Sequence, residues 1–131
     1  MAPSTLEHVN ITVSNPEKTA NLLCTLFGWH IRWFGDAKNG GTTYHVGSDD
    51  TYLAVYAENE AKNPAYDTYH SRGGLNHIGV VVDDLDAVEA RVRAAGFTTH
   101  SHADYEPGRR FYFDDSDGVE FEVVSYQAVD A

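Results

Sequence analysis

Two short segments of the chain are similar to one another, and each has a histidine at its third position. Their sequences are LEHVNITV, beginning at Leu6, and LNHIGVVV, beginning at Leu75. In both, apolar residues recur at every second position, which predicts a strand with one buried face. The same alternation places His8 and His77 on the opposite face of their strands. Histidines at equivalent positions on matching faces are well suited to metal or acid–base chemistry.

A carboxylate is expected on the matching face of the last predicted strand. Glu120 and Glu122 alternate there with apolar residues, so both are predicted to point away from the buried face. Two neutral imidazoles and one carboxylate bind divalent ions such as Fe, Mn, Zn or Ni and leave coordination positions open for a substrate oxygen or dioxygen. A single strand histidine is more often structural, so this hypothesis depends on the duplication.

Aromatic and polar side chains are predicted on the same faces. Tyr52 and Tyr56 flank Ala54 in one strand, and Asn10 shares the face of His8. Such residues are typical of a pocket for a small organic ligand with a few polar anchors. Aromatic filling of a core layer would give the same pattern.

The stretch between His100 and Tyr112 is rich in His, Arg and Tyr. Arg109 or Arg110 could orient a substrate carboxylate or phosphonate through paired hydrogen bonds, or form an ordinary ion pair. We take Tyr112 and Arg110 as candidate catalytic residues and Arg109 as a candidate pocket residue. His100 and His102 share a face by strand alternation and, with no carboxylate motif near them, are expected to be structural.

The two histidine segments belong to two tandem copies of one module, at about residues 5–60 and 74–126, joined by a linker at about 59–74. Each copy is predicted to be βαβββ. The strands are expected near residues 6–13, 29–34, 42–46 and 52–57, and near 75–82, 97–102, 110–114 and 120–126. We expect an α+β fold, a single domain over residues 1–131, in which two modules form a curled mixed sheet around a cleft. His45, on a strand, and His70, in the linker, could reach that cleft or lie at the surface.

Each predicted helix has recognisable ends. Asn15 and Pro16 are an N-cap and a first-turn proline, and Gly28 ends the helix. Asp83 or Asp84 caps the second helix, which ends at Gly96. The apolar stripes of the two helices are Ala20, Leu23, Cys24 and Phe27, and Leu85, Val88, Val92 and Ala95.

The composition narrows the choice of partners. The chain has 131 residues, a formal net charge of −11 and one cysteine. Such a charge repels a phosphate backbone or an anionic membrane over most of the surface, and no apolar run is long enough to span a bilayer. We therefore expect a cytoplasmic protein that binds neither nucleic acid nor membrane.

The sequence resembles the vicinal oxygen chelate superfamily, which includes glyoxalases, bleomycin resistance proteins and extradiol dioxygenases. The resemblance covers both modules and is carried by LEHVNITVSNPEK, LNHIGVVVDDLD and FYFDDSDGVEFEV. Metal-binding members take their ligands from the first and last strands of each module. The end motif of the family, similar to Asp-Pro-Asp-Gly followed by Glu, selects Glu122 over Glu120, so the resemblance implies His8, His77 and Glu122 as metal ligands.

The chain departs from the glyoxalase pattern at Ala54, where the resemblance would place a second ligating Glu. The remaining His-His-Glu set is similar to that of extradiol dioxygenases. We therefore favour a metal-dependent enzyme acting on a small oxygenated molecule, dioxygenase-like in its ligands rather than a lactoylglutathione lyase. The alternative is a metal-free binding protein of the bleomycin-resistance type. Family members are commonly dimers, so a homodimer is expected, with the site within one chain or shared between two.

Overall fold

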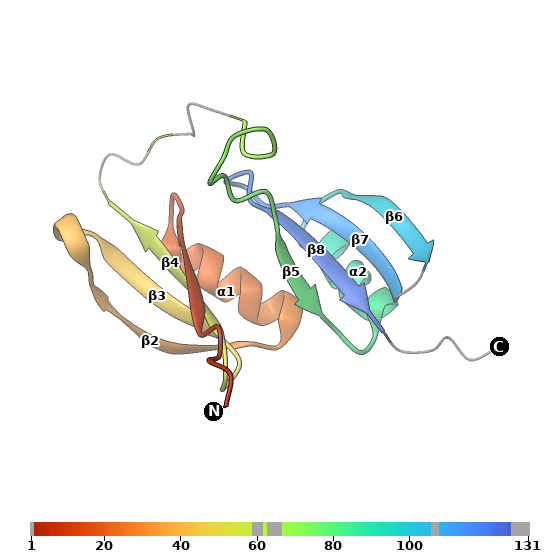
Figure 1. Cartoon of the computed structure of the whole chain (residues 1–131), viewed down its shortest axis with the longest axis horizontal. Coiled ribbons are helices and arrows are strands. Elements are labelled where there is room, and N and C mark those ends of the chain that lie inside the picture. The colour runs from red at the N-terminus through yellow and green to blue at the C-terminus, as the bar shows by residue number, and fades with distance from the viewer. Residues whose placement is uncertain (1, 59–61, 63–66, 106–107, 127–131) are drawn as a thin grey trace. The chain divides into compact units, whose positions relative to one another are not determined.

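The computed structural model describes residues 2–58, 62, 67–105 and 108–126. Contacts divide the chain into two compact units, one on each side of the boundary after Lys62. Each unit is a four-stranded sheet with one helix (Figure 1).

The first unit has the element order βαβββ. Its elements are β1 (His8–Thr12), α1 (Pro16–Phe27), β2 (His30–Asp36), the short 3₁₀ turn η1 (Lys38–Gly40), β3 (Thr42–Gly47) and β4 (Tyr52–Ala57). The strand order is β1-β4-β3-β2. β1 runs parallel to β4, and the other two pairings are antiparallel.

The second unit repeats this architecture. Its elements are β5 (Ile78–Val81), α2 (Leu85–Ala94), β6 (Thr99–Tyr105), β7 (Gly108–Asp114) and β8 (Glu120–Ser125). The strand order β5-β8-β7-β6 matches that of the first sheet, with β5 parallel to β8. The predicted α+β fold of tandem βαβββ modules is therefore confirmed.

The helix ends follow local side-chain chemistry. The Asn15 carboxamide oxygen accepts a hydrogen bond from the Lys18 backbone N–H (3.1 Å), and Gly28 ends α1 with a left-handed φ of 70°. Asp84, one of the two predicted caps, accepts from Ala87 N–H at 3.1 Å. Ala95 was expected in the apolar stripe of α2, but it is the exposed C-cap residue. The stripe ends one turn earlier because α2 itself stops at Ala94.

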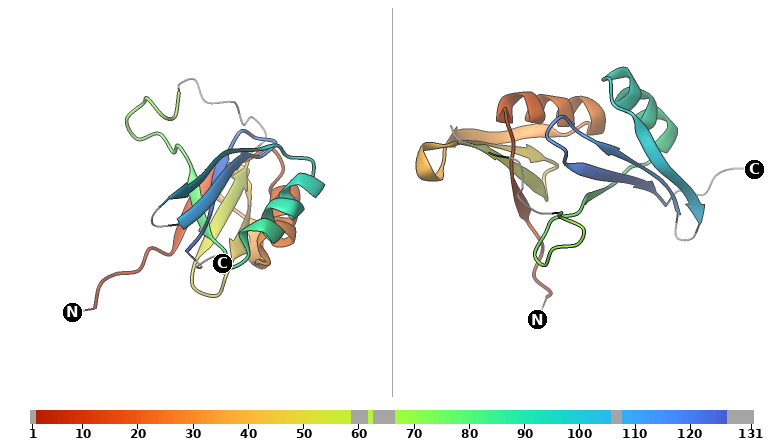
Figure 2. Two further views of the ribbon diagram at one scale, coloured as in Figure 1. Left: turned by 90° about the vertical axis from the view of Figure 1, so that its right-hand side faces the viewer. Right: turned by 90° about the horizontal axis from the view of Figure 1, so that it is seen from above.

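Each helix covers one face of its own sheet, as the views in Figure 2 show. The strands place alternate apolar side chains on that face and bury them: Ile11, Val46, Leu53 and Val55 in the first unit, and Val80, Phe111, Phe113, Phe121 and Val123 in the second. We call the other face of each sheet its open face. It carries the predicted site residues His8, Glu122 and Tyr112, because side chains alternate between faces along a strand.

β6 begins two residues later than the predicted strand near residues 97–102. Phe97 packs its ring against Phe113, 6.0 Å between centroids, before the strand starts. No helix in the described part of the chain is long and apolar enough to cross a membrane.

Candidate functional site

Glu122 lies at the centre of the open face of the second sheet. Strand register places it between Gly79 of β5 and Tyr112 of β7, and His100 of β6 follows Tyr112. These residues form one row across the four strands. His77 stands just before β5, on the same face.

Three side chains converge on the Glu122 carboxylate. The Tyr112 hydroxyl donates to Oε2 at 2.8 Å, and Arg110 Nη1 donates to Oε1 at 2.9 Å. His77 Nε2 lies 3.2 Å from Oε2. The side chains of Glu122 and Arg110 are only 14% and 12% exposed, so water screens their ion pair weakly. Predicted catalytic and metal-ligating residues are thus brought together within one unit.

The His77 ring is held by aromatic neighbours. Its centroid is 5.7 Å from that of Tyr112, edge to face, and 6.5 Å from that of Tyr69. Burial, together with a hydrogen bond to Glu120, raises the pKa of Tyr69 to about 12, so Tyr69 stays protonated at neutral pH. His77 Nδ1 is buried and has no hydrogen-bond partner among the described residues. A buried nitrogen of this kind is costly unless something binds it.

His8 lies on the open face of the first sheet. Its Nδ1 is 2.9 Å from the Glu7 carboxylate, and its ring stacks on Tyr52 at 4.9 Å. Among the described residues, no three His, Cys, Asp or Glu side chains lie together as a group that could hold a metal ion. The three predicted ligands are divided between the two units.

His45 takes the position in the first sheet that Tyr112 holds in the second. It is paired across the strands with Ala54, and its ring lies 4.5 Å from that of Tyr52. Burial lowers the pKa of His45, and the nearby His8 and Arg32 lower it further. Thr43 and His45 lie two residues apart in β3 and share one face of the strand, whereas the buried Val46 lies on the other. Strand alternation alone therefore predicts His45 on the open face.

The other predicted pocket residues of the first sheet differ in their exposure and in their partners. Ala54 is 2% exposed. The Tyr56 hydroxyl lies 2.9 Å from the Lys38 carbonyl oxygen and 2.8 Å from a Glu58 carboxylate oxygen. Asn10, paired with Ala54 in the register, is exposed. The Tyr52 hydroxyl donates to Glu7 Oε1 at 3.3 Å, so Tyr52 is anchored locally as Tyr56 is.

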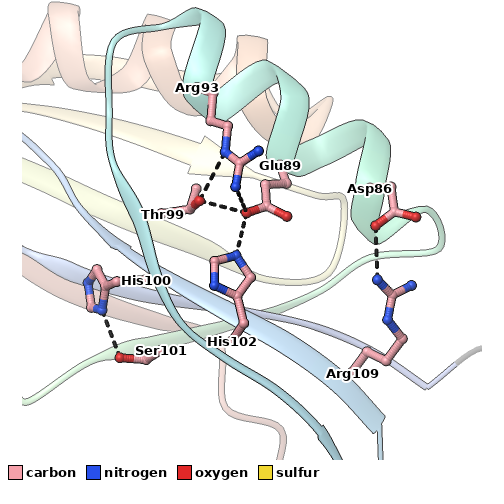
Figure 3. A network of polar contacts seen from close by, with 8 residues as sticks. All are labelled: Asp86, Glu89, Arg93, Thr99, His100, Ser101, His102 and Arg109. Atoms are coloured by element: carbon pink, nitrogen blue, oxygen red, sulfur yellow. Dashed lines mark hydrogen bonds and ion pairs between the residues drawn. The ribbon is translucent and has the colours of Figure 1, made fainter.

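Arg109 was predicted to line the pocket, and the structure places it elsewhere. Its guanidinium contacts Asp86 of α2, with Nη2 donating at 3.0 Å (Figure 3). Arg109 therefore lies on the helix-covered face, whereas Arg110 lies on the open face with Glu122. Adjacent strand residues point to opposite sides, so only one of the two could have faced the site.

His100 and His102 do not share a face, contrary to the expectation from alternation. A β-bulge lies between His100 and Ala103, and Ser101 has a φ of 56°. Such a bulge shifts the alternation by one residue. His100 consequently stacks near Tyr112 at 6.2 Å, whereas His102 Nε2 lies 2.6 Å from Glu89 of α2 (Figure 3). His70, also left open by the sequence, is 83% exposed and bonded to Asp67.

Comparison with protein families identifies the architecture. The model of the Glyoxalase/Bleomycin resistance protein/Dioxygenase superfamily matches residues 5–123. The chain belongs to this superfamily. The predicted resemblance is therefore confirmed over both modules. No curated protein matches the chain.

Solved structures of superfamily members share the fold. A glyoxylase/bleomycin resistance protein/dioxygenase domain from Frankia sp. EAN1pec has a TM-score of 0.80 and 19% identity, covering 96% of this chain and 100% of that one. A glyoxalase family protein from Enterococcus faecalis has a TM-score of 0.73 and 20% identity, covering 92% and 96%. The fosfomycin resistance protein FosX from Listeria monocytogenes, as a variant complexed with Mn(II) and 1S,2S-dihydroxypropylphosphonic acid, has a TM-score of 0.71 and 18% identity, covering 98% and 96%.

Proposed function

We propose that this superfamily member binds a divalent metal ion through His77, Glu122 and His8 and acts on a small oxygenated organic molecule. The observation that carries the proposal is the pairing of His77 with Glu122 on the open face of the second sheet. Fe, Mn, Zn and Ni all suit two imidazoles and a carboxylate.

The distance between the two donor atoms supports this proposal. Metal–nitrogen and metal–oxygen bonds of about 2.1 Å put neighbouring ligand atoms about 3.0 Å apart in an octahedral site and about 3.4 Å apart in a tetrahedral one. His77 Nε2 and Glu122 Oε2 are 3.2 Å apart. The pair could therefore share an ion with little movement of either side chain.

The Glu122 carboxylate also retains acceptor capacity. Two carboxylate oxygens offer about four lone-pair sites. Tyr112 and Arg110 occupy one site on each oxygen, which leaves one on each for His77 or an ion. Tyr112 and Arg110 would thus orient the carboxylate rather than block it, a role that supporting residues commonly have around metal ligands.

The metal ion, Tyr112 and Arg110 would each have a distinct role in the proposed site. A bound divalent ion supplies Lewis acidity that polarises a substrate oxygen. Tyr112 holds a hydroxyl proton at Glu122 Oε2, close enough to be donated to a substrate oxygen that replaces this hydrogen bond. Arg110 keeps positive charge beside the Glu122 carboxylate and holds it in place through the hydrogen bond from Nη1 to Oε1. Ala54 supplies no carboxylate, so we propose a dioxygenase-like ligand set rather than that of a lactoylglutathione lyase.

His8 would complete the ligand set from the first unit, either of the same chain or of a second copy. We propose a homodimer on the resemblance to a family whose members are commonly dimers, and a cytoplasmic location remains a prediction. The Mn(II) in the FosX complex is consistent with a divalent ion on this fold. Sedimentation velocity of the untagged protein tests the dimer, and a single monomeric species would refute it.

The decisive test is metal content. Untagged protein, purified without chelators, is analysed by plasma mass spectrometry as wild type, His77→Ala and, as a matched control, His70→Ala, whose ring is exposed and bonded only to Asp67 within the described residues. We expect near-stoichiometric metal in the wild type and in His70→Ala, and its loss in His77→Ala. Metal-free wild type that stays so after anaerobic incubation with each ion would refute the proposal.

The second candidate is a metal-free small-molecule binding protein. Its specific support is the ion pair of Arg110 with Glu122, which already balances the carboxylate charge without a metal. The aromatic residues on the open face of the first sheet would then do the binding. Metal-free wild type that binds an aromatic ligand would favour this alternative.

A further inference from the structure

The open face of the first sheet carries a run of ring side chains. The centroids of Trp33 and His45 are 5.1 Å apart, and those of His45 and Tyr52 are 4.5 Å apart. The Trp33 ring also lies over Gly35, where an added Cβ would be 2.8 Å from Trp33 Cζ2. Glycine at this position therefore lets the indole lie against the sheet. Trp33 nevertheless remains 51% exposed, so much of its ring faces outward.

The guanidinium group of Arg32 lies beside one of these rings. The Arg32 guanidinium carbon lies 4.6 Å from the centroid of the Tyr52 ring. The register of β2 shifts between Ile31 and Trp33, and this bulge lets Arg32 and Trp33, although consecutive, approach the same side. Among the described residues, no carboxylate lies within ion-pair distance of Arg32. The Glu7 carboxylate, 3.3 Å from the Tyr52 hydroxyl, interacts electrostatically with Arg32 at longer range, and the Arg32 side chain is exposed, so its guanidinium is accessible to an anionic ligand.

We propose that Arg32, Trp33, His45 and Tyr52 form a binding site for a small planar aromatic carboxylate. The guanidinium fork matches a carboxylate, and the rings offer a π surface on which an aromatic ring stacks. An aliphatic acid would use only the first feature, and a neutral aromatic compound only the second. This proposal stands on the first unit alone and does not depend on the metal ligands His77 and Glu122.

The test is isothermal titration calorimetry of the untagged full chain with three probes at pH 7.5. The probes are 2-naphthoate, which has both features, cyclohexanecarboxylate, which lacks the π surface, and 2-naphthol, which is uncharged at this pH. We expect 2-naphthoate to bind about tenfold tighter than either comparison compound, since a stacked aromatic pair or a charge-assisted fork each changes affinity by roughly that factor. Equal binding of all three probes, or no binding of 2-naphthoate at millimolar concentration, would overturn the proposal.

Neighbouring residues provide matched variants. Trp33→Leu is compared with Phe34→Leu, because Phe34 is the next residue, 62% exposed, and stacks on Tyr44 on the other face. Arg32→Gln is compared with Arg72→Gln, an exposed arginine of the second unit. We expect Trp33→Leu and Arg32→Gln each to weaken 2-naphthoate binding about tenfold and the two controls to bind as the wild type does.

A second copy of the chain could instead cover these rings. Sedimentation velocity of Trp33→Leu distinguishes this case: conversion of a wild-type dimer to monomer, with 2-naphthoate binding absent in both, would overturn the ligand proposal in favour of a self-association surface. His77→Ala should retain 2-naphthoate binding, so failure of the metal proposal and failure of this one are separable.

Discussion

The two consecutive arginines Arg109 and Arg110 show how a single residue step changes the environment of a charge. Arg110 pairs with Glu122, and both side chains are largely buried. Arg109 pairs with Asp86, whose side chain is 74% exposed. Water screens the second pair far more strongly than the first. The chemistry of the site therefore depends on which arginine the strand turns toward Glu122.

Replacement of the two arginines should separate their contributions. Arg110→Met leaves the Glu122 carboxylate part-buried without its cation, and we expect a loss of about 2–3 kcal/mol in the free energy of unfolding. Arg109→Met, the matched control, should cost about 0.5 kcal/mol or less. Urea unfolding at pH 7 measures both. Equal losses for the two variants would contradict the assignment of Arg110 to the buried ion pair.

Asp115 holds the turn before β8. Its Oδ1 accepts hydrogen bonds from the backbone N–H groups of Asp117 (2.9 Å) and Val119 (3.0 Å), while burial raises the pKa of its carboxyl above the ordinary value. A raised folded-state pKa gives an acid stability that is fully present below its unfolded pKa and is lost as pH rises through the folded pKa. Asn at this position keeps the acceptor oxygen and has no charge to bury.

Asp115→Asn should therefore become more stable relative to the wild type as pH rises from about 3.5 to 7. The measurement is the difference in free energy of unfolding between variant and wild type over this range, with Asp114→Asn, an exposed neighbour, as the control. A difference that stays constant or falls with pH would contradict the assigned direction of the Asp115 shift.

At the scale of elements, α2 is joined to β6 through one carboxylate. Glu89 accepts from Thr99 Oγ1 at 2.6 Å and from Arg93 Nη2 at 2.9 Å, and His102 Nε2 lies 2.6 Å away (Figure 3). Burial opposes its ionisation, but the hydrogen bonds from His102 and Thr99 outweigh burial, so the pKa of Glu89 lies below its ordinary 4.5. The bulge at Ser101 makes this junction by turning His102 toward the helix.

Glu89→Gln should weaken this junction. We expect a loss of about 2 kcal/mol in the free energy of unfolding at pH 7, because three hydrogen bonds lose their charged acceptor. A lowered folded-state pKa gives stability that is present above the unfolded value and lost as pH falls through the folded one. The difference from wild type should therefore shrink below pH 4.5. Asp86→Asn, on the same helix but exposed, serves as the control, and a pH-independent difference for Glu89→Gln would refute the argument.

At the scale of the whole molecule, one βαβββ design occurs twice with different chemistry on its open faces. The row Asn10, Ala54, His45 and Trp33 in the first sheet corresponds to Gly79, Glu122, Tyr112 and His100 in the second. The first face has rings and a cation, and the second has a carboxylate with its donors. Duplication followed by such divergence lets one fold carry two unlike surfaces.

The proposed metal site predicts an effect of one unit on the other. His8→Ala, in the first unit, should weaken zinc binding by more than the 10–100-fold typical of a supporting residue, because it removes a ligand. Competition with a chromophoric chelator measures the affinity. His30→Ala, an exposed histidine of the same unit, is the control. Wild-type affinity in His8→Ala would confine any metal to the second unit.

Local chemistry made much of this architecture predictable. The helices begin as expected at Asn15, Pro16 and Asp84, and α1 ends as expected at Gly28, because capping depends on residues close in sequence. Strand alternation correctly put His77 on the face of Glu122, since regular strands keep a period of two. The same rule failed after Ser101, where a bulge with no strong sequence signal interrupts the period.

Periodicity and capping act over a few residues, so the tandem modules, the helix ends and the candidate side chains are predictable from the chain alone. The partners of these side chains are set by packing: Arg110 rather than Arg109 pairs with Glu122, Glu89 with His102, and Arg32 with the Tyr52 ring. These contacts join residues of different strands and helices. Their choice depends on register, bulges and burial, which arise when distant segments pack together.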